Sequence, residues 1–78
     1  MSTESRETAL AVLARVTGRA RAEIAIEMSL VGDLGIDSPK ALELLLELEE
    51  ALGIEISDRD ASGMDTVRDV IAFADRVA

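Results

Sequence analysis

The sequence predicts an all-α protein, namely a small antiparallel four-helix bundle with three long helices, one short helix and a long first loop. Apolar residues recur at helical spacing in three stretches, and residues typical of helix ends flank each stretch. The 78 residues, 49% of them hydrophobic, suit one small core, so we expect a single domain over residues 1–78. The absence of cysteine excludes disulfides and thiolate metal sites.

The first helix is expected from about Glu4 to Val16, with Ser2 or Thr3 as its cap and Gly18 as its stop. Its apolar stripe, which would face the core, consists of Ala9, Leu10, Val12, Leu13 and Val16.

A long connection, residues 17–37, follows the first helix, and its apolar residues show no sustained helical period. Loops of this length are often functional or packed by their own side chains. We expect the apolar residues to close the open end of the bundle, with Ser29 capping a single turn over residues 30–32.

The second long helix is expected from Pro39 to Leu52, ended by Gly53. Proline suits the first helical position and forces the preceding residue into an extended conformation, which predicts Ser38 as the N-cap. The apolar stripe of this helix consists of Ala41, Leu44, Leu45, Leu48 and Leu52, bordered by Leu42. The opposite side carries Glu43, Leu46, Glu47 and Glu50. That side is either a solvated face or a docking surface with Leu46 as its apolar anchor.

The remainder of the chain predicts one short and one long helix. Residues 54–56 read as extended, and Ser57 or Asp58 can cap a short turn after them. The last helix is expected to start at Thr66, with Asp69 in the position of a capping box. Its apolar stripe consists of Val67, Val70, Ile71, Ala74 and Val77, with Phe73 at the edge.

Charge narrows the classes of partner. The chain has 16 acidic and 8 basic residues, and residues 23–65 contain 12 of the acidic residues but only 2 of the basic ones. Such an acidic segment disfavours nucleic acid and anionic membranes, and it favours basic protein partners or serves solubility alone. No apolar run approaches the ~20 residues of a membrane span, and the first residues lack a signal-peptide pattern. We therefore expect no membrane insertion and a cytoplasmic location.

Ser38 is the candidate functional residue, but the sequence gives it no catalytic partners. The absence of histidine excludes a Ser-His-Asp triad, and no nucleophile elbow, P-loop or dinucleotide fingerprint occurs. Without a base, Ser38 would be a poor nucleophile, so no catalytic residue is predicted. A phosphate attached to Ser38 would face free N–H groups at the positive end of the helix dipole. The alternative, favoured by the local sequence alone, is that Ser38 is merely a cap.

The segment from Asp58 to Asp69 partly matches a calcium-binding EF-hand loop. It departs from that pattern at its eighth position, which is Asp65, at its twelfth position, which is Asp rather than Glu, and in lacking an entering helix. We interpret these carboxylates as caps and surface and predict no metal site, with weak divalent-ion binding as the alternative.

Four landmarks of the sequence resemble the acyl carrier protein family over essentially the whole chain. These are Leu34-Gly35-Ile36-Asp37-Ser38, the Leu/Glu-rich helix after it, Gly53-Ile54-Glu55-Ile56-Ser57-Asp58 and Thr66-Val67. The resemblance implies that Ser38 carries 4′-phosphopantetheine, transferred from coenzyme A by a magnesium-dependent phosphopantetheinyl transferase. It further implies a monomeric carrier that presents acyl thioesters to acyl-loading and acyl-processing enzymes with basic docking patches.

The resemblance also implies roles for other residues. Partner enzymes would contact Asp37, Pro39, Glu43, Leu46, Glu47 and Glu50. An acyl pocket would be lined by Leu44, Leu48, Ile56, Ala61 and Met64.

The residues after Ser38 depart from the family pattern. Family members usually have Asp-Ser-Leu, often followed by an acidic residue, whereas this chain has Asp37-Ser38-Pro39-Lys40. The departure suggests a specialised carrier for fatty-acid, lipid or polyketide synthesis. The alternatives are an unmodified carrier-like interaction module or an aminoacyl or peptidyl carrier. Asp37 argues against a peptidyl carrier, in which Gly-Gly-x-Ser is common.

Overall fold

The computed structural model describes residues 3–77 and is helical throughout its regular elements. The elements are α1 (Thr3–Thr17), the 3₁₀ helix η1 (Arg21–Glu23), α2 (Ser38–Leu52), α3 (Asp58–Ser62) and α4 (Val67–Val77). Three long helices and one short helix confirm the predicted fold class, while η1 was not predicted. Helix α1 already includes Thr3, and the alternative cap, Ser2, lies outside the described residues. No helix within residues 3–77 has both the length and the apolar character needed to cross a membrane.

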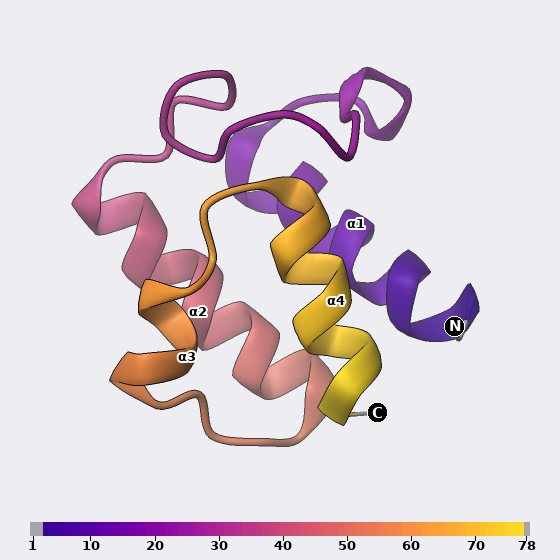
Figure 1. Cartoon of the computed structure of the whole chain (residues 1–78). Coiled ribbons are helices and arrows are strands. Elements are labelled where there is room, and N and C mark those ends of the chain that lie inside the picture. The colour runs from indigo at the N-terminus through magenta and orange to yellow at the C-terminus, as the bar shows by residue number, and fades with distance from the viewer. Residues whose placement is uncertain (1–2, 78) are drawn as a thin grey trace.

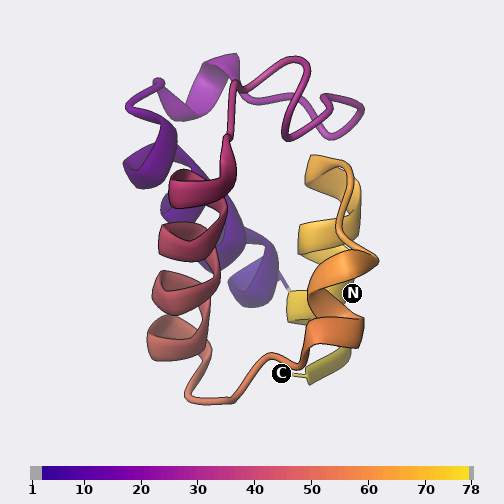
Figure 2. The ribbon, with the colours of Figure 1, turned by 90° about the vertical axis from the view of Figure 1, so that its left-hand side faces the viewer.

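Helix α1 is the packing centre of the bundle, because it contacts both α2 and α4. It runs toward the end of the molecule that the long loop closes, whereas α2 and α4 run away from that end (Figures 1 and 2). In Figure 1 the short helix α3 lies in front of α2 and to the left of α4.

The core is aliphatic and uses the predicted stripes. All five stripe residues of α1 are buried, as are Leu44 and Leu48 of α2 and the α4 stripe up to Ala74. Phe73, predicted at the edge of the α4 stripe, is also buried. The largest fully buried side chains are Leu13, Leu48, Val67 and Val70. The three long helices therefore share one hydrophobic cluster, in which α1 packs against both α2 and α4.

The long loop closes the end of the bundle, as predicted. Its residues Ile24, Leu30, Leu34 and Ile36 are buried in the core cluster. Its backbone also satisfies the start of α4, where helix N–H groups have no partner within the helix. The Val67 N–H donates to the Met28 carbonyl oxygen at 3.0 Å, and the Arg68 N–H donates to the Ile26 carbonyl oxygen at 2.9 Å. The predicted turn at Ser29 is present, because the Gly32 N–H donates to Ser29 Oγ at 3.0 Å.

The connection between α2 and α3 is anchored at specific residues. Gly53 ends α2 in the left-handed region, with φ of 68°, a conformation that favours glycine. The Ile56 N–H then donates to Glu49 Oε2 at 2.7 Å, which ties the connection back to α2. Ser57 caps α3, accepting from the Asp60 N–H at 3.1 Å, so one of the two predicted caps is confirmed.

Helix α4 begins with the predicted capping box. The Asp69 N–H donates to Thr66 Oγ1 at 3.2 Å, and the Thr66 N–H donates to Asp69 Oδ2 at 3.0 Å. The Asp65 N–H donates to the same carboxylate oxygen, also at 3.0 Å. The backbone N–H groups of Asp65 and Thr66 lower the pKa of the Asp69 carboxyl from its ordinary value of 3.8. Asp69 is therefore a helix cap, in agreement with the interpretation of this carboxylate as a cap rather than as part of an EF-hand loop.

Asp69→Asn should make the protein less stable at neutral pH and less sensitive to acid. Because folding depresses the pKa of Asp69, its stabilisation is full above the unfolded pKa near 3.8 and is lost as the pH falls through the folded pKa. We expect the variant to lose about 0.5–1 kcal/mol at pH 7, the worth of a hydrogen bond. Urea unfolding of both proteins from pH 7 to pH 3 measures this. A difference that stays constant with pH would contradict the role of the ionised carboxyl.

Candidate functional site

The start of α2 displays Ser38, but Asp37 rather than Ser38 is the N-cap. Asp37 has an extended backbone with φ of −86° and ψ of −176°, and its Oδ1 accepts from the Lys40 N–H at 3.0 Å. Its carbonyl oxygen accepts the first helical bond, from the Ala41 N–H at 2.7 Å. The prediction of Ser38 as cap and Pro39 as first helical residue was therefore wrong by one position.

The physical reason is that aspartate caps as well as serine does, and its side chain one residue earlier reaches the third helical N–H. Proline lacks an N–H and is tolerated throughout the first turn, so Pro39 does not decide between the two registers. The shift releases the Ser38 hydroxyl from a capping role.

Ser38 is exposed, and no other described residue forms a hydrogen bond with its hydroxyl. The segment before it is fixed: Ile36 is buried, and its N–H donates to the Leu30 carbonyl oxygen at 3.0 Å. Ser38 is thus a free hydroxyl on a rigid support, suited to an incoming group.

Because α2 begins at Ser38 with Asp37 as its cap, few backbone N–H groups are free to bind a group attached to Ser38. The Lys40 N–H is already used by Asp37, and Pro39 has no N–H, so fewer N–H groups are free than the sequence suggested. The Lys40 ammonium also points elsewhere, donating to the Val16 carbonyl oxygen at 3.2 Å. That contact stabilises the C-terminal end of α1. A phosphodiester at Ser38 would be accommodated by the solvent exposure of this residue and by the positive end of the α2 dipole.

The predicted docking residues of α2 divide into two groups. Pro39, Glu43, Leu46 and Glu47 line one groove together with Lys40 and Leu42. Asp37 and Glu50 are exposed outside that groove. The Glu47 side chain is only 23% exposed, because its Oε1 accepts from Arg15 Nη1 of α1 at 2.7 Å.

Sequence reasoning missed Leu42 as a surface residue. It was placed at the border of the apolar stripe, yet 59% of it is exposed, beside Leu46 at 55%. The four-residue spacing between the two leucines was the signal that they share a face.

An apolar cavity of about 360 Å³ opens between α2, α3 and the long loop. It brings together three of the predicted pocket residues, Leu44, Ala61 and Met64. Leu48 does not line it, being fully buried in the core, and neither does Ile56, which packs against the core half-buried. The lining that sequence reasoning missed is Leu30, Val31, Ile36, Ala41 and Leu45, with Asp58 and Ser62.

The cavity lies next to the start of α2. Ile36 and Ala41, which belong to its lining, flank Ser38 in the chain. The loop contribution could not be read from periodicity, because only the fold brings residues 30–36 against α3. A group attached to Ser38 would therefore start beside an apolar cavity whose volume is within the range of typical ligand pockets.

Comparison with known proteins identifies this arrangement. A family model described as the phosphopantetheine attachment site matches residues 7–74. The chain belongs to the acyl carrier protein family. The resemblance seen in the sequence is confirmed, and the prosthetic group of this family is 4′-phosphopantetheine. The family serves biosynthetic enzymes as a carrier.

Its relatives include mycobacterial and rhodococcal carriers. The meromycolate extension acyl carrier protein of Mycobacterium tuberculosis (strain ATCC 25618 / H37Rv) is 38% identical over 66 residues, covering 85% of this chain and 57% of the relative. The chain thus spans little more than half of that protein's length. The acyl carrier protein of Rhodococcus erythropolis is 32% identical, covering 85% of this chain and 72% of the relative.

A solved structure agrees with the fold. The structure of a candidate acyl carrier protein, Rv0033 from Mycobacterium tuberculosis, superimposes with a TM-score of 0.80 at 40% sequence identity. The match covers 87% of this chain and 90% of that one.

Proposed function

We propose that this protein is a discrete carrier that holds acyl intermediates as thioesters on a 4′-phosphopantetheine arm attached to Ser38. The observation that carries the proposal is the free Ser38 hydroxyl on a rigid helix start, beside an apolar cavity, in a chain of the acyl carrier protein family. Residues 1–78 would form one monomeric carrier domain that acts as a shuttle rather than a catalyst. Because loading consumes coenzyme A, we place the protein in the cytoplasm.

Ser38 supplies the oxygen that becomes bonded to phosphorus, and it needs help from outside the chain. No described residue accepts a hydrogen bond from its hydroxyl, so the base that removes the proton belongs to the transferase. The thiol at the end of the arm supplies the thioester chemistry. An apolar acyl chain would enter the cavity at Leu44, Ala61 and Met64, whereas Leu48 and Ile56 belong to the core and its border rather than to the lining.

The proposed partners are a phosphopantetheinyl transferase and acyl-loading and acyl-processing enzymes with basic docking patches. Glu43 and Glu50 are exposed and can meet such patches directly. Glu47 would have to break its ion pair with Arg15 before it could pair with a basic residue of the partner, so its contribution to the binding energy is smaller. Pro39 and Lys40 change the surface next to Ser38, so a dedicated set of enzymes fits better than a general one. The names of the mycobacterial relatives favour lipid-chain extension among the specialised fatty-acid, lipid and polyketide pathways.

Intact-mass spectrometry tests the proposal. Incubation with coenzyme A, magnesium and a transferase should add the mass of one phosphopantetheine group. Peptide mapping should place it on Ser38 and leave the peptides with Ser57 and Ser62 unmodified. Several transferases of different specificity should be compared, because Pro39 replaces the usual leucine. No mass gain with any of them would contradict the proposal.

A further inference from the structure

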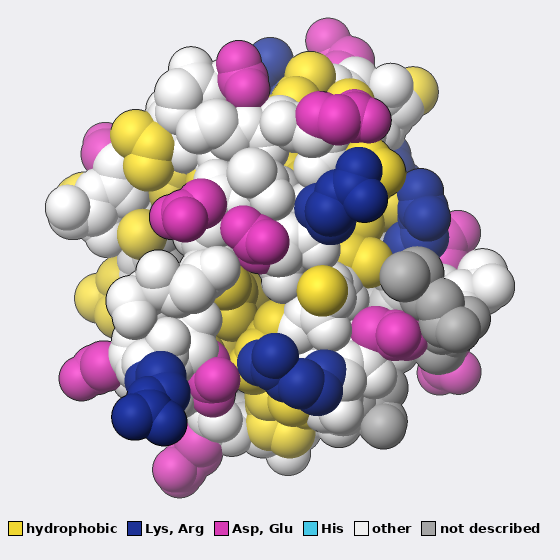
Figure 3. Space-filling view, viewed as in Figure 1, with side chains coloured by type: hydrophobic (Ala, Val, Ile, Leu, Met, Phe, Trp, Pro, Cys, Tyr) yellow, Lys and Arg dark blue, Asp and Glu magenta, His cyan; other side chains and the backbone are white. Residues whose placement is uncertain are grey.

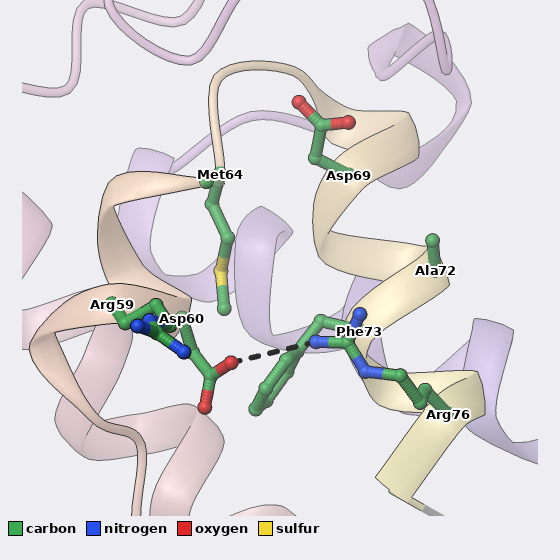
Figure 4. A pocket seen from close by; sticks show the side chains of 8 residues that line it. Arg59, Asp60, Met64, Asp69, Ala72, Phe73 and Arg76 are labelled. Atoms are coloured by element: carbon green, nitrogen blue, oxygen red, sulfur yellow. Dashed lines mark ion pairs between the residues drawn. The ribbon is translucent and has the colours of Figure 1, made fainter.

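A second cavity, of about 350 Å³, lies on the other side of α3, between α3 and α4. Its lining includes Arg59, Asp60, Met64, Phe73 and Arg76 (Figure 4). Met64 and Phe73 point into this space from the α3–α4 connection and from α4, and Phe73 is only 4% exposed. The cavity therefore has an apolar floor under a charged rim.

The rim contains more hydrogen-bond donors than acceptors. Arg76 Nη2 lies 3.5 Å from Asp60 Oδ1, and the guanidinium is 5.4 Å from the centre of the Phe73 ring. The same Asp60 carboxyl group also accepts from Ser57 Oγ at 3.0 Å. Asp69, the other acid of the lining, is occupied by the capping box.

The Arg59 guanidinium forms neither a hydrogen bond nor an ion pair with another described residue, although the Arg59 carbonyl oxygen accepts from Ser62 Oγ at 3.0 Å. In the space-filling view, basic side chains lie over α3 and α4 on either side of an acidic one, around a hollow with hydrophobic atoms (Figure 3). Of the two guanidinium groups in the lining, only that of Arg76 has a carboxylate partner, so an acceptor on a ligand could be bound here.

Met64 separates this cavity from the one beside Ser38, because it belongs to the lining of both. Methionine has a flexible, unbranched side chain that adapts to irregular space. Met64 lies in the connection that follows α3, and α3 is five residues long and makes few contacts with the other helices. A change of the Met64 rotamer would join the two cavities into one passage under α3.

We propose that the cavity between α3 and α4 binds the distal end of a carried acyl chain that bears an oxygen acceptor, such as a keto, hydroxyl or carboxylate group. The inference rests on the proposed function and names the class of its cargo. The chain enters beside Ser38, passes Met64, and places its oxygen where Arg76 or Arg59 donates to it. A purely hydrocarbon end is disfavoured in this cavity, because it would take water from the guanidinium groups without replacing the hydrogen bonds.

Phe73 makes the proposal measurable, because it is the only aromatic residue of the chain and its ring protons give isolated NMR signals. The protein is loaded at Ser38 with non-hydrolysable phosphopantetheine conjugates of two equally long chains, one ending in a methyl group and one in a carboxylate. We expect the carboxylate chain to shift the Phe73 ring signals and the methyl chain to leave them nearly unchanged. Equal shifts with both chains would overturn the oxygen selectivity, and no shift with either chain would overturn the site.

Variants locate the contact. Arg76→Met keeps an apolar stem on Phe73 but removes the donor, and we expect it to weaken the carboxylate-dependent population about threefold, in the range of an exposed ion pair. Met64→Ile, whose β-branched side chain lacks the flexibility of methionine and leaves Phe73 as the only aromatic residue, should close the passage and abolish the shift. The matched control is Arg68→Met, also on α4 but outside both cavities. An equal effect of the control would contradict the assignment.

Mass spectrometry of each sample separates the two proposals. A protein that cannot be loaded at Ser38 refutes the carrier function, whereas a loaded protein without the selective Phe73 shift refutes only the cargo class.

Discussion

Ser38→Ala is expected to abolish the addition of phosphopantetheine while leaving the fold and its stability intact. The loss should be complete, because the hydroxyl oxygen is the atom that becomes bonded to phosphorus. The stability should change by less than about 0.5 kcal/mol, since the hydroxyl has no hydrogen-bond partner among the described residues and alanine is favourable in a first helical turn. Intact mass after incubation with transferase and coenzyme A gives the first quantity, and urea unfolding gives the second.

Asp37→Ala is the matched variant, and we expect it to lower the stability while retaining the addition of phosphopantetheine. It retains the hydroxyl but loses the cap that accepts the Lys40 N–H, so we expect about 1 kcal/mol of destabilisation. The full mass gain should still be reached, more slowly where the transferase contacts the Asp37 carboxylate. If Ser38→Ala were the more destabilising variant, the assignment of Asp37 as the cap would be wrong.

The Ser38→Ala variant also distinguishes the carrier function from the alternative, an unmodified interaction module. In the alternative, the exposed leucines of α2 and the acidic residues beside them would bind a partner, and Ser38 would be a bystander. Ser38→Ala would then retain biological activity. Loss of activity with a normal unfolding curve favours the carrier.

The elements of this fold were predictable because each long helix has a regular apolar stripe and clear end signals. The capping box of Thr66 and Asp69 is an example, since both partners lie within four residues of each other. The register at Ser38 was not predictable in this way. Asp37 and Ser38 are both good caps, and the choice depends on how the buried Ile36 positions the chain before α2.

The cavities were less predictable than the helices, because their walls come from segments distant in sequence. Leu44, Ala61 and Met64 were predicted through the family resemblance, whereas the loop residues Leu30 and Val31 carry no periodic signal. The charged cavity depends on Arg59 and Arg76, which look like ordinary surface residues until α3 folds against α4. Contacts between elements, rather than patterns within them, decided these features.

Leu48→Ala should produce the largest loss of stability among single substitutions in α2. Leu48 has 0% exposure and lies in the cluster between α1, α2 and α4, so truncation leaves a void in a rigid core. Leu→Ala changes of this kind cost 2–5 kcal/mol, and we expect about 3 kcal/mol here. That is a large part of the roughly 4–12 kcal/mol available to 78 residues. The thermal midpoint should fall by roughly 12–24 °C.

Leu42→Ala is the control for this prediction, because it makes the same chemical change on the same helix at a side chain that is 59% exposed. We expect it to alter the free energy of unfolding by less than about 0.5 kcal/mol. The comparison decides what Leu48 does. If Leu48 served mainly as a wall of the acyl pocket, its truncation would enlarge the space for a carried chain at little expense in stability. A loss below about 1 kcal/mol would therefore support the pocket role, whereas a loss near 3 kcal/mol assigns Leu48 to the core that holds α2, and with it Ser38, in place.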